Sequence, residues 1–313
     1  MIVEIKRRKQ LFRRKPVQIM LYAVAIVFIF IFALEVAVII TGNVFTIFVF
    51  KTQSGLHLKR TCLLLINLAV ADLLVGVGEV VVLVIHRIPV IDIRSLSVWW
   101  ALQVFGLCAS LMFLALISLE RVYAVFWPLR HRVTSTRAYF LSIVTVWAIG
   151  LCTTGLCLLT VYHADVDTLY AVAATDLVLL ISLGIICASY LSIRSRLYAT
   201  QADVQDGQRR STRDQNIRLS KTFYLVVAVS LIFWLPGFLV YTINEFCPQC
   251  FSSTLLWLGN VLHLANSMVN PLVYSFRMKI FKDALKKCWK KRFDLRPVSR
   301  SVQNAPQEFI TYL

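Results

Sequence analysis

The chain has 313 residues, of which 58% are hydrophobic and only 16% are charged. Soluble domains carry roughly 25% charged residues, so this composition excludes a soluble globular protein and indicates a membrane protein. The formal net charge of +17 does not indicate nucleic acid binding, because the basic residues gather in particular loops between apolar segments.

Seven apolar windows follow one another along the chain. A helix of about 20 apolar residues crosses the hydrocarbon core and satisfies its own backbone hydrogen bonds there. The sequence therefore predicts an all-α membrane protein, a seven-transmembrane helix bundle with a short amphipathic eighth helix. The windows cover residues 21–50, 61–85, 97–119, 138–161, 170–193, 222–243 and 252–275.

Charge and hydropathy divide the chain into four parts. Residues 1–20 form a basic segment, and Met20 is an alternative start of the native chain. Residues 21–276 form the seven-span domain. Residues 277–291 are expected to form an amphipathic helix on the inner leaflet, because apolar positions recur every three or four residues between basic ones. Residues 292–313 are expected to form a cytoplasmic tail.

Lysines and arginines mark one side of the predicted membrane. The segments after spans one, three, five and seven carry three, four, seven and ten of them, whereas those after spans two, four and six carry two, none and none. The positive-inside rule places the first set in the cytoplasm. We therefore expect a multi-pass plasma membrane protein with its N-terminus outside and its C-terminus in the cytoplasm. The seven basic residues within residues 1–20 oppose this orientation but are outnumbered.

An adjacent carboxylate and guanidinium, Glu120 and Arg121, follow the third apolar window. Charge at a membrane edge costs a few kcal/mol unless it is paired or hydrated. One interpretation is a functional ion pair. The other is an arginine that snorkels to the lipid interface beside a glutamate.

Two polar side chains lie in the middle of apolar spans, Asn43 in the first and Asp72 in the second. Lipid offers them no hydrogen-bond partner, and acids inside a membrane are candidate functional residues. The structural alternative is a packing hydrogen bond between helices. Because no lysine or arginine lies at the depth of Asp72, this carboxylate is expected to be neutral or bound to a cation.

Prolines interrupt the sixth and seventh spans. Proline removes a backbone hydrogen bond and kinks a helix. Pro236 follows the bulky indole of Trp234, a pattern that favours a hinge, although a tolerated membrane proline is the alternative. Pro271 follows Asn270 and precedes Tyr274 by three residues.

These residues occur in the order and spans of a known family. From about residue 21 to 290 the chain resembles a rhodopsin-like (class A) G-protein-coupled receptor. The resemblance implies that Glu120 holds Arg121 at rest and that Arg121 meets a heterotrimeric G protein once the sixth helix swings out. Tyr190 and Tyr274 would hold the open state, and Trp234 would pivot below the ligand. The motifs are Gly42-Asn43, Leu68-Ala69-x-Ala71-Asp72, Glu120-Arg121-Val122 with Pro128-Leu129, Trp147, Tyr190, Trp234-x-Pro236 and Asn270-Pro271-x-x-Tyr274.

The chain also departs from the family pattern. Leu96 stands where a cysteine is usual, and Ser182 where a proline is usual. These departures give a looser resemblance to the melanocortin, sphingolipid, cannabinoid and adenosine group of receptors. Within that group, adenosine receptors keep the usual disulfide and proline. Asn216 replaces a frequent glutamate, so an arginine lock to the sixth helix is not expected. Gln103 stands where amine receptors have an aspartate, so a peptide or lipid ligand is favoured over an amine.

Polar and aromatic side chains of the outer half are the candidate ligand-binding residues. Acids there suit a cationic peptide, whereas aromatic side chains and a short second outer loop suit a lipid. The candidates are Glu79, Trp100, Gln103, Asp176, Tyr241 and His263.

Oxygen donors accompany Asp72 in the pattern of the family. Ser110 lies eleven residues before Arg121, about three helical turns, and therefore on nearly the same face of its helix. Carboxylate and hydroxyl oxygens with a single formal charge suit a hard monovalent cation. Because related receptors hold sodium at these positions, the resemblance implies an allosteric sodium ion and no organic cofactor. The expected ligands are Asp72, Ser110, Asn266, Ser267 and Asn270.

Cysteines and the chain end carry three further expectations. Cys247 and Cys250 enclose two residues in the third outer loop, and an oxidising exterior favours a disulfide over a redox motif or half a zinc site. Cys288 lies on the apolar side of the amphipathic helix, where it is a palmitoylation candidate or a plain buried thiol. The final residue, Leu313, ends a sequence that resembles a PDZ-domain ligand.

Other function classes are weaker. An enzyme is not expected, because no constellation of nucleophile, base and orienting group appears. A retinal protein would need a lysine in the seventh span, and residues 251–276 contain none. The odd span count disfavours a transporter, which remains an alternative together with a non-signalling or constitutively active seven-helix protein. The expected partners are an extracellular ligand, a heterotrimeric G protein and the bilayer, with no nucleic acid.

Overall fold

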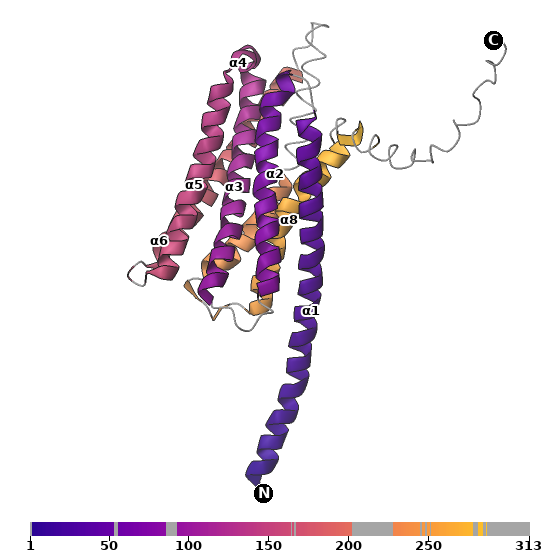
Figure 1. The fold of residues 1–313 in the computed structure, drawn as a ribbon, viewed down its shortest axis with the longest axis vertical. Helices are drawn as coiled ribbons and strands as arrows, with labels where there is room; N and C mark the ends of the chain where they lie inside the picture. The colour runs from indigo at the N-terminus through magenta and orange to yellow at the C-terminus, as the bar shows by residue number, and fades with distance from the viewer. Residues whose placement is uncertain are drawn as a thin grey trace, which may run out of the picture.

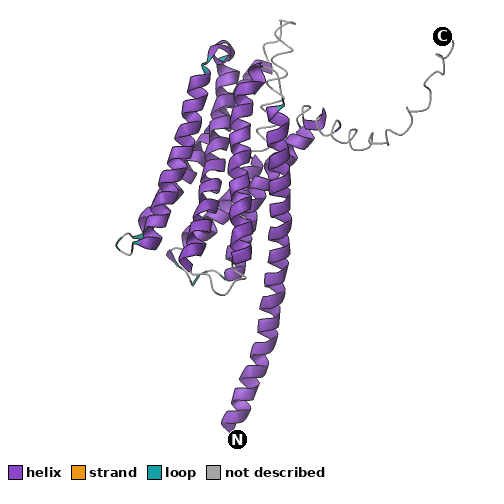
Figure 2. Ribbon diagram, in the orientation of Figure 1, coloured by secondary structure: helices purple, strands orange, loops and turns teal. Residues whose placement is uncertain are grey.

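The computed structural model is helical throughout the residues that it describes (Figures 1 and 2). These residues are 2–52, 56–85, 93–163, 165, 167–201, 228–244, 246–247, 249–250, 252–277, 281–283 and 286. The helices are α1 Ile2–Lys51, α2 Leu56–Ile85, α3 Ile93–Phe126, α4 Pro128–Val133, α5 Thr136–Tyr162, α6 Thr168–Gln201, the helix Ala228–Asn244 and α8 Ser253–Arg277.

The first five predicted windows are confirmed as helices that are long and apolar enough to cross a membrane. Their apolar parts are Tyr22–Lys51, Arg60–Val84, Ser97–Phe126, Thr136–Tyr162 and Leu169–Arg196. The helix Ala228–Asn244 is a shorter apolar helix within the sixth window, whose first residues, 222–227, lie outside the described part of the chain. The seventh window corresponds to α8.

The basic N-terminal segment continues α1 instead of forming a separate part. α1 runs without a break from Ile2 to Lys51, and Figure 1 shows its first turns extending beyond the end of the other helices. Residues 2–41 contain no glycine, and the helix continues past Pro16 and the basic residues around it. The expected boundary at residue 20 is therefore not a boundary of secondary structure.

α3 is the central helix of the bundle. It packs against α2, α5 and α6, and 72% of its apolar span is buried, against 22% for α1. Phe113 of α3 is fully buried and its ring meets that of Trp147 on α5 at 5.4 Å. A helix surrounded in this way can present polar side chains to three neighbours at once.

Two glycines allow helices to approach closely. A Cβ on Gly106 of α3 would lie 2.9 Å from the carbonyl oxygen of Ala71 on α2. A Cβ on Gly42 of α1 would lie 2.9 Å from Cβ of Pro271 on α8. Small residues at such crossings bring helix backbones together in membranes, so these positions set the spacing of α2 from α3 and of α1 from α8.

The helices alternate in direction, which gives the bundle two different ends. We call the end that holds Arg121, α4 and the C-terminus of α1 the Arg121 end, and the end near the α5–α6 connection the cavity end. In Figure 1 the Arg121 end is at the top, where α4 is labelled.

Candidate functional site

Arg121 and Glu120 form a buried ion pair between α2 and α3. Arg121 is 4% exposed and Glu120 is 6% exposed, and Nε of Arg121 donates to Oε2 of Glu120. Thr61 on α2 bridges them: Arg121 Nη2 donates to Thr61 Oγ1 at 2.9 Å, and Thr61 Oγ1 donates to Glu120 Oε1 at 3.0 Å. A snorkelling arginine would extend to the lipid interface, whereas this one is enclosed by protein.

α4 supplies Glu120 with a further partner, His131. Nε2 of His131 lies 2.8 Å from Glu120 Oε1 and 3.3 Å from the hydroxyl of Tyr139 on α5. Arg60 Nη1 donates to the carbonyl oxygen of His131 at 3.1 Å. The sequence does not mark Thr61 or His131 as partners of Glu120, because both belong to other elements and only the packing brings them together.

Asp72 is the centre of a second buried polar group. Its side chain is fully buried; Ser110 Oγ donates to Oδ1 at 2.7 Å and Asn270 Nδ2 donates to Oδ2 at 2.8 Å. Asn266 and Ser267 of α8 are also fully buried. Within the described part of the chain, Ser267 Oγ, Asn270 Oδ1 and the amide of Asn266 have no hydrogen-bond partner. Buried oxygens of this kind beside a carboxylate fit a small hard cation.

The remaining membrane motifs tie neighbouring helices together. Asn43 Nδ2 donates to the carbonyl oxygen of Ser267 at 3.3 Å and joins α1 to α8. Trp147 Nε1 donates to Asn67 Oδ1 at 2.9 Å and joins α5 to α2. For Asn43 this contact is the packing hydrogen bond considered as its structural alternative.

Tyr190 and Tyr274 lie in separate surroundings. The hydroxyl of Tyr190 accepts a hydrogen bond of 3.2 Å from Arg194 one turn along α6. Tyr274 is 1% exposed and packs against Phe50 and Phe281. The hydroxyl of Tyr274 has no partner among the described residues.

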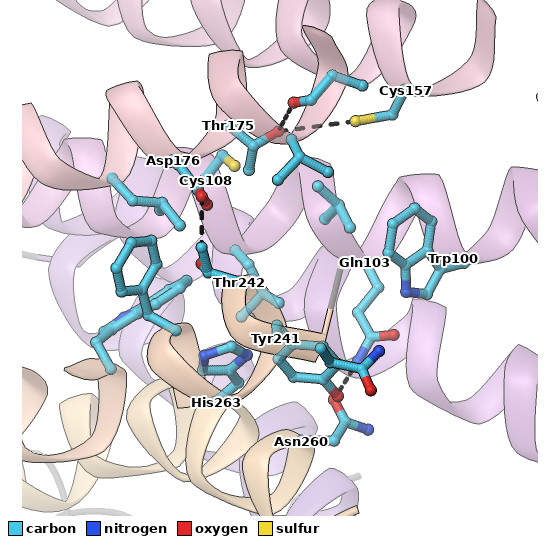
Figure 3. A pocket seen from close by; sticks show the side chains of 18 of the residues that line it. Trp100, Gln103, Cys108, Cys157, Thr175, Asp176, Tyr241, Thr242, Asn260 and His263 are labelled. Carbon is cyan, nitrogen blue, oxygen red and sulfur yellow. Dashed lines mark hydrogen bonds between the residues drawn. The ribbon is translucent and has the colours of Figure 1, made fainter. Parts of the chain in front are cut away.

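A cavity of about 330 Å³ lies toward the other end of the bundle, enclosed by α3, α5, α6, the helix Ala228–Asn244 and α8 (Figure 3). The lining side chains are both apolar and polar, as is usual for small-molecule sites. Five of the six candidate ligand-binding residues line it: Trp100, Gln103, Asp176, Tyr241 and His263.

Glu79, the sixth candidate ligand-binding residue, is not among the described residues that line the cavity. It is 2% exposed and lies behind the cavity wall, where its Oε2 accepts hydrogen bonds from Gln103 Nε2 at 2.8 Å and from Asn260 Nδ2 at 3.3 Å. No residue of α2 lines the cavity, because Gln103 of α3 and Asn260 of α8 meet in front of it. Glu79 therefore positions two lining amides instead of lining the cavity itself.

An aromatic column forms one wall of the cavity and leads toward the bundle interior. The ring of His263 lies 5.4 Å from that of Tyr241 and 4.7 Å from that of Trp234. Trp234 is 2% exposed, lines the cavity and lies two residues before Pro236. A bound molecule that moved against this wall would therefore press on a side chain next to Pro236 of the helix Ala228–Asn244.

Asp176 joins α6 to that same helix. Oγ1 of Thr242 donates to Asp176 Oδ2 at 3.2 Å (Figure 3). Thr242 and Asn260 are lining residues that the sequence does not single out. The sequence does not show which face of an apolar helix a polar residue occupies. Only the packing of the helices therefore identifies Thr242 and Asn260 as lining residues.

Cys247 and Cys250 form the expected disulfide, with a Cα–Cα distance of 5.4 Å. The residues described here contain no group of three or more His, Cys, Asp or Glu side chains that could hold a metal ion. Asn216, Cys288 and Leu313 lie outside the described residues. Of the expected amphipathic helix 277–291, residues 277, 281–283 and 286 are described, and Phe281 is fully buried against α1 and α8.

Comparison with known proteins agrees with this arrangement. Residues 42–274 match the family described as 7 transmembrane receptor (rhodopsin family). Adenosine receptor A2a of Canis lupus familiaris is 29% identical over 290 residues, which cover 81% of this chain and 70% of that receptor. Adenosine receptor A3 of Ovis aries is 28% identical over 268 residues, which cover 78% of this chain and 83% of that receptor.

The matched region contains the buried pair at Arg121, the polar group at Asp72 and nearly the whole cavity wall. The chain is thus a multi-pass membrane receptor and not an enzyme. It belongs to the rhodopsin family of seven-transmembrane, G-protein-coupled receptors.

Proposed function

We propose that this receptor lies in the plasma membrane with its N-terminus outside, binds an extracellular ligand in the cavity and activates a heterotrimeric G protein at its Arg121 end. The observation that carries this proposal is the separation of two built sites, the cavity at one end and the buried Glu120–Arg121 pair at the other. Trp234 touches the cavity and belongs to the helix that would have to move.

Activation requires Arg121 to leave Glu120. Outward movement of the helix Ala228–Asn244, hinged near Pro236, would open the Arg121 end. An arginine carries five donors and a permanent charge, so it can donate to carbonyl oxygens at the end of a partner's helix. Tyr190 and Tyr274 would then stabilise the open arrangement.

Replacing Arg121 with alanine tests this coupling. Arg121→Ala is expected to abolish G-protein nucleotide exchange while leaving surface expression and ligand binding largely intact; binding is retained because the cavity lies at the opposite end. Exchange is measured in membranes with G proteins of each class, without added ligand and with a panel of peptides, lipids and adenosine. Arg137→Ala is the matched control, since Arg137 is an exposed arginine at the same end of the bundle. Undiminished exchange by Arg121→Ala would exclude the proposed coupling.

The class of ligand rests on the cavity wall. Gln103 lines the cavity where amine receptors of this family have an aspartate, which favours a peptide or lipid over an amine. Both relatives carry the name adenosine receptor, so adenosine is the neutral small molecule to test beside them. A PDZ partner at Leu313 and palmitoylation of Cys288 are further parts of the proposal that rest on the sequence.

We also propose that a sodium ion binds at Asp72. The residues that would hold it are Asp72, Ser110, Asn266, Ser267 and Asn270; their support is full burial and the oxygens that have no partner in the described chain. The ion would supply one positive charge beside a buried carboxylate and so remove the cost of leaving that charge unpaired. Bound there, it would favour the packed resting arrangement of α2, α3 and α8.

A further inference from the structure

The described wall of the cavity has an acidic side chain and no lysine or arginine. Asp176 is the acidic residue among the described side chains that line it, and the lining contains no lysine or arginine. Asp176 is half-buried, and Thr242 is its one hydrogen-bond donor within the described residues. A single neutral donor leaves most of the acceptor capacity of a carboxylate unused.

Two further carboxylates lie in the same half of the bundle. Glu79 lies directly behind the lining amides of Gln103 and Asn260, and Glu35 of α1 is 6% exposed with one oxygen that has no partner in the described residues. Neither takes part in a described salt bridge; the described salt bridges join Glu120 to Arg121 and to His131.

The lysines and arginines whose side chains the structure describes are at the Arg121 end. Lys51, Arg60 and Arg196 are among them. Among the described side chains, the nearest charged groups to the cavity are therefore acids, in surroundings of low dielectric where charges interact strongly. Such a site attracts cations and repels anions.

The shape of the wall suits an organic cation. Trp100, Phe238 and Tyr241 line the cavity with aromatic surface, and aromatic faces attract ammonium and guanidinium groups. Figure 3 shows Asp176 with Thr242 at one side of the cavity and Trp100 and Gln103 at the other. A molecule that spans the cavity can place a charge on Asp176 and apolar surface against the indole.

We infer that the ligand of this receptor carries an alkylammonium or guanidinium group and that Asp176 is its counter-ion. This inference rests on the proposed use of the cavity as the ligand site. It places the counter-ion on α6. This differs from amine receptors of the family, whose aspartate lies on α3 at the position that Gln103 occupies here.

Thiol labelling of the full-length receptor tests the charge selectivity without a known ligand. Cys157 lines the cavity, and its Sγ lies 3.7 Å from Oγ1 of Thr175, the neighbour of Asp176. Cys157 labelling rates are measured by peptide mass mapping for cationic, neutral and anionic methanethiosulfonates of similar size. The cationic reagent is expected to exceed the anionic one, and Asp176→Asn is expected to lower that ratio by about tenfold.

Two variants control this result. Asp167→Asn makes the same change at an exposed residue near the start of α6 that does not line the cavity, and it should leave the ratio unchanged. Asp176→Glu keeps the charge and should keep the ratio. The inference is overturned if the parent shows no cation preference, if Asp176→Asn retains it, or if Asp167→Asn loses it equally. It is also overturned if the neutral reagent fails to reach Cys157, an outcome that leaves the Arg121→Ala test of coupling intact.

Protection experiments then distinguish the sources of the cation. Agmatine and an arginine-containing tetrapeptide amide are each added at millimolar concentration before the neutral reagent, with adenosine as the uncharged comparison. Slower labelling with agmatine supports a free small cation, and slower labelling with the peptide alone supports a basic peptide. Protection by adenosine alone, or by none of the three, would overturn the inference.

Discussion

His131 gives the glutamate of the Arg121 pair a partner that belongs to another element. Its contact with Glu120 at 2.8 Å fixes the carboxylate against α4, and a hydrogen bond to a charged group contributes about 1.5–3 kcal/mol. We expect His131→Ala to loosen the hold of Glu120 on Arg121 and to raise ligand-independent nucleotide exchange severalfold. His163→Ala, an exposed histidine at the cavity end, is the control. Equal basal exchange in the parent and His131→Ala would contradict a role in the resting state.

Some residues of the candidate site could be predicted from the sequence, and others could not. Arg121, Asp72 and Pro271 stand out in the sequence, because a charge is costly in an apolar helix and so is the loss of the backbone N–H that proline lacks. Residue type and position in the span are therefore enough to mark them as candidates. Thr61 and His131 are ordinary residues of other elements, and their role depends on how helices rotate and pack. The place of Glu79 behind the amides of Gln103 and Asn260 could not be predicted for the same reason, although its depth in the membrane could.

The crossing of α2 and α3 depends on Gly106. A Cβ there would meet the carbonyl oxygen of Ala71 and the backbone nitrogen of Val75, each at 2.9 Å, and neither can move without its helix. We expect Gly106→Ala to destabilise the bundle by about 1–3 kcal/mol and to lower the apparent melting temperature of the purified receptor by several degrees. Gly155→Ala on α5 meets nothing within 4 Å and should leave melting unchanged or raise it, because alanine favours a helix over glycine. Equal melting of the two variants would show that the crossing tolerates a methyl group.

Elements were predictable where one physical requirement dominates. The first five spans follow from the length of apolar helix that a bilayer needs; the structure has them within three residues of the predicted bounds, except that the third ends at Phe126 instead of residue 119. α4 has only six residues and no buried side chain, so it leaves no hydrophobic signal in the sequence. The long start of α1 was hidden for a different reason: its charge suggested a separate segment, whereas the helix continues across that change without a break.

At the scale of the whole molecule, polar groups lie at successive levels along the bundle axis. Glu79 near the cavity, Asp72 with its oxygen donors and the Glu120–Arg121 pair each join α3 to another helix. A change at one level can alter the next only if the helices that they share move together. Asp72 lies between the other two on the path, because α2, α3 and α8 all meet there.

A cation at Asp72 should therefore stabilise the whole resting bundle. A ligand that binds the folded state alone raises its stability in proportion to the logarithm of its concentration above the dissociation constant. We expect the purified receptor to melt a few degrees higher in sodium chloride than in N-methylglucamine chloride at equal ionic strength, and its basal nucleotide exchange to be lower in sodium, since the linkage between ion and active state is reciprocal. Asp72→Asn keeps the shape of the side chain and removes the charge, so it should abolish both differences, whereas Asp167→Asn should keep them. The proposal fails if the parent melts alike in the two salts, or if Asp72→Asn responds to sodium as the parent does.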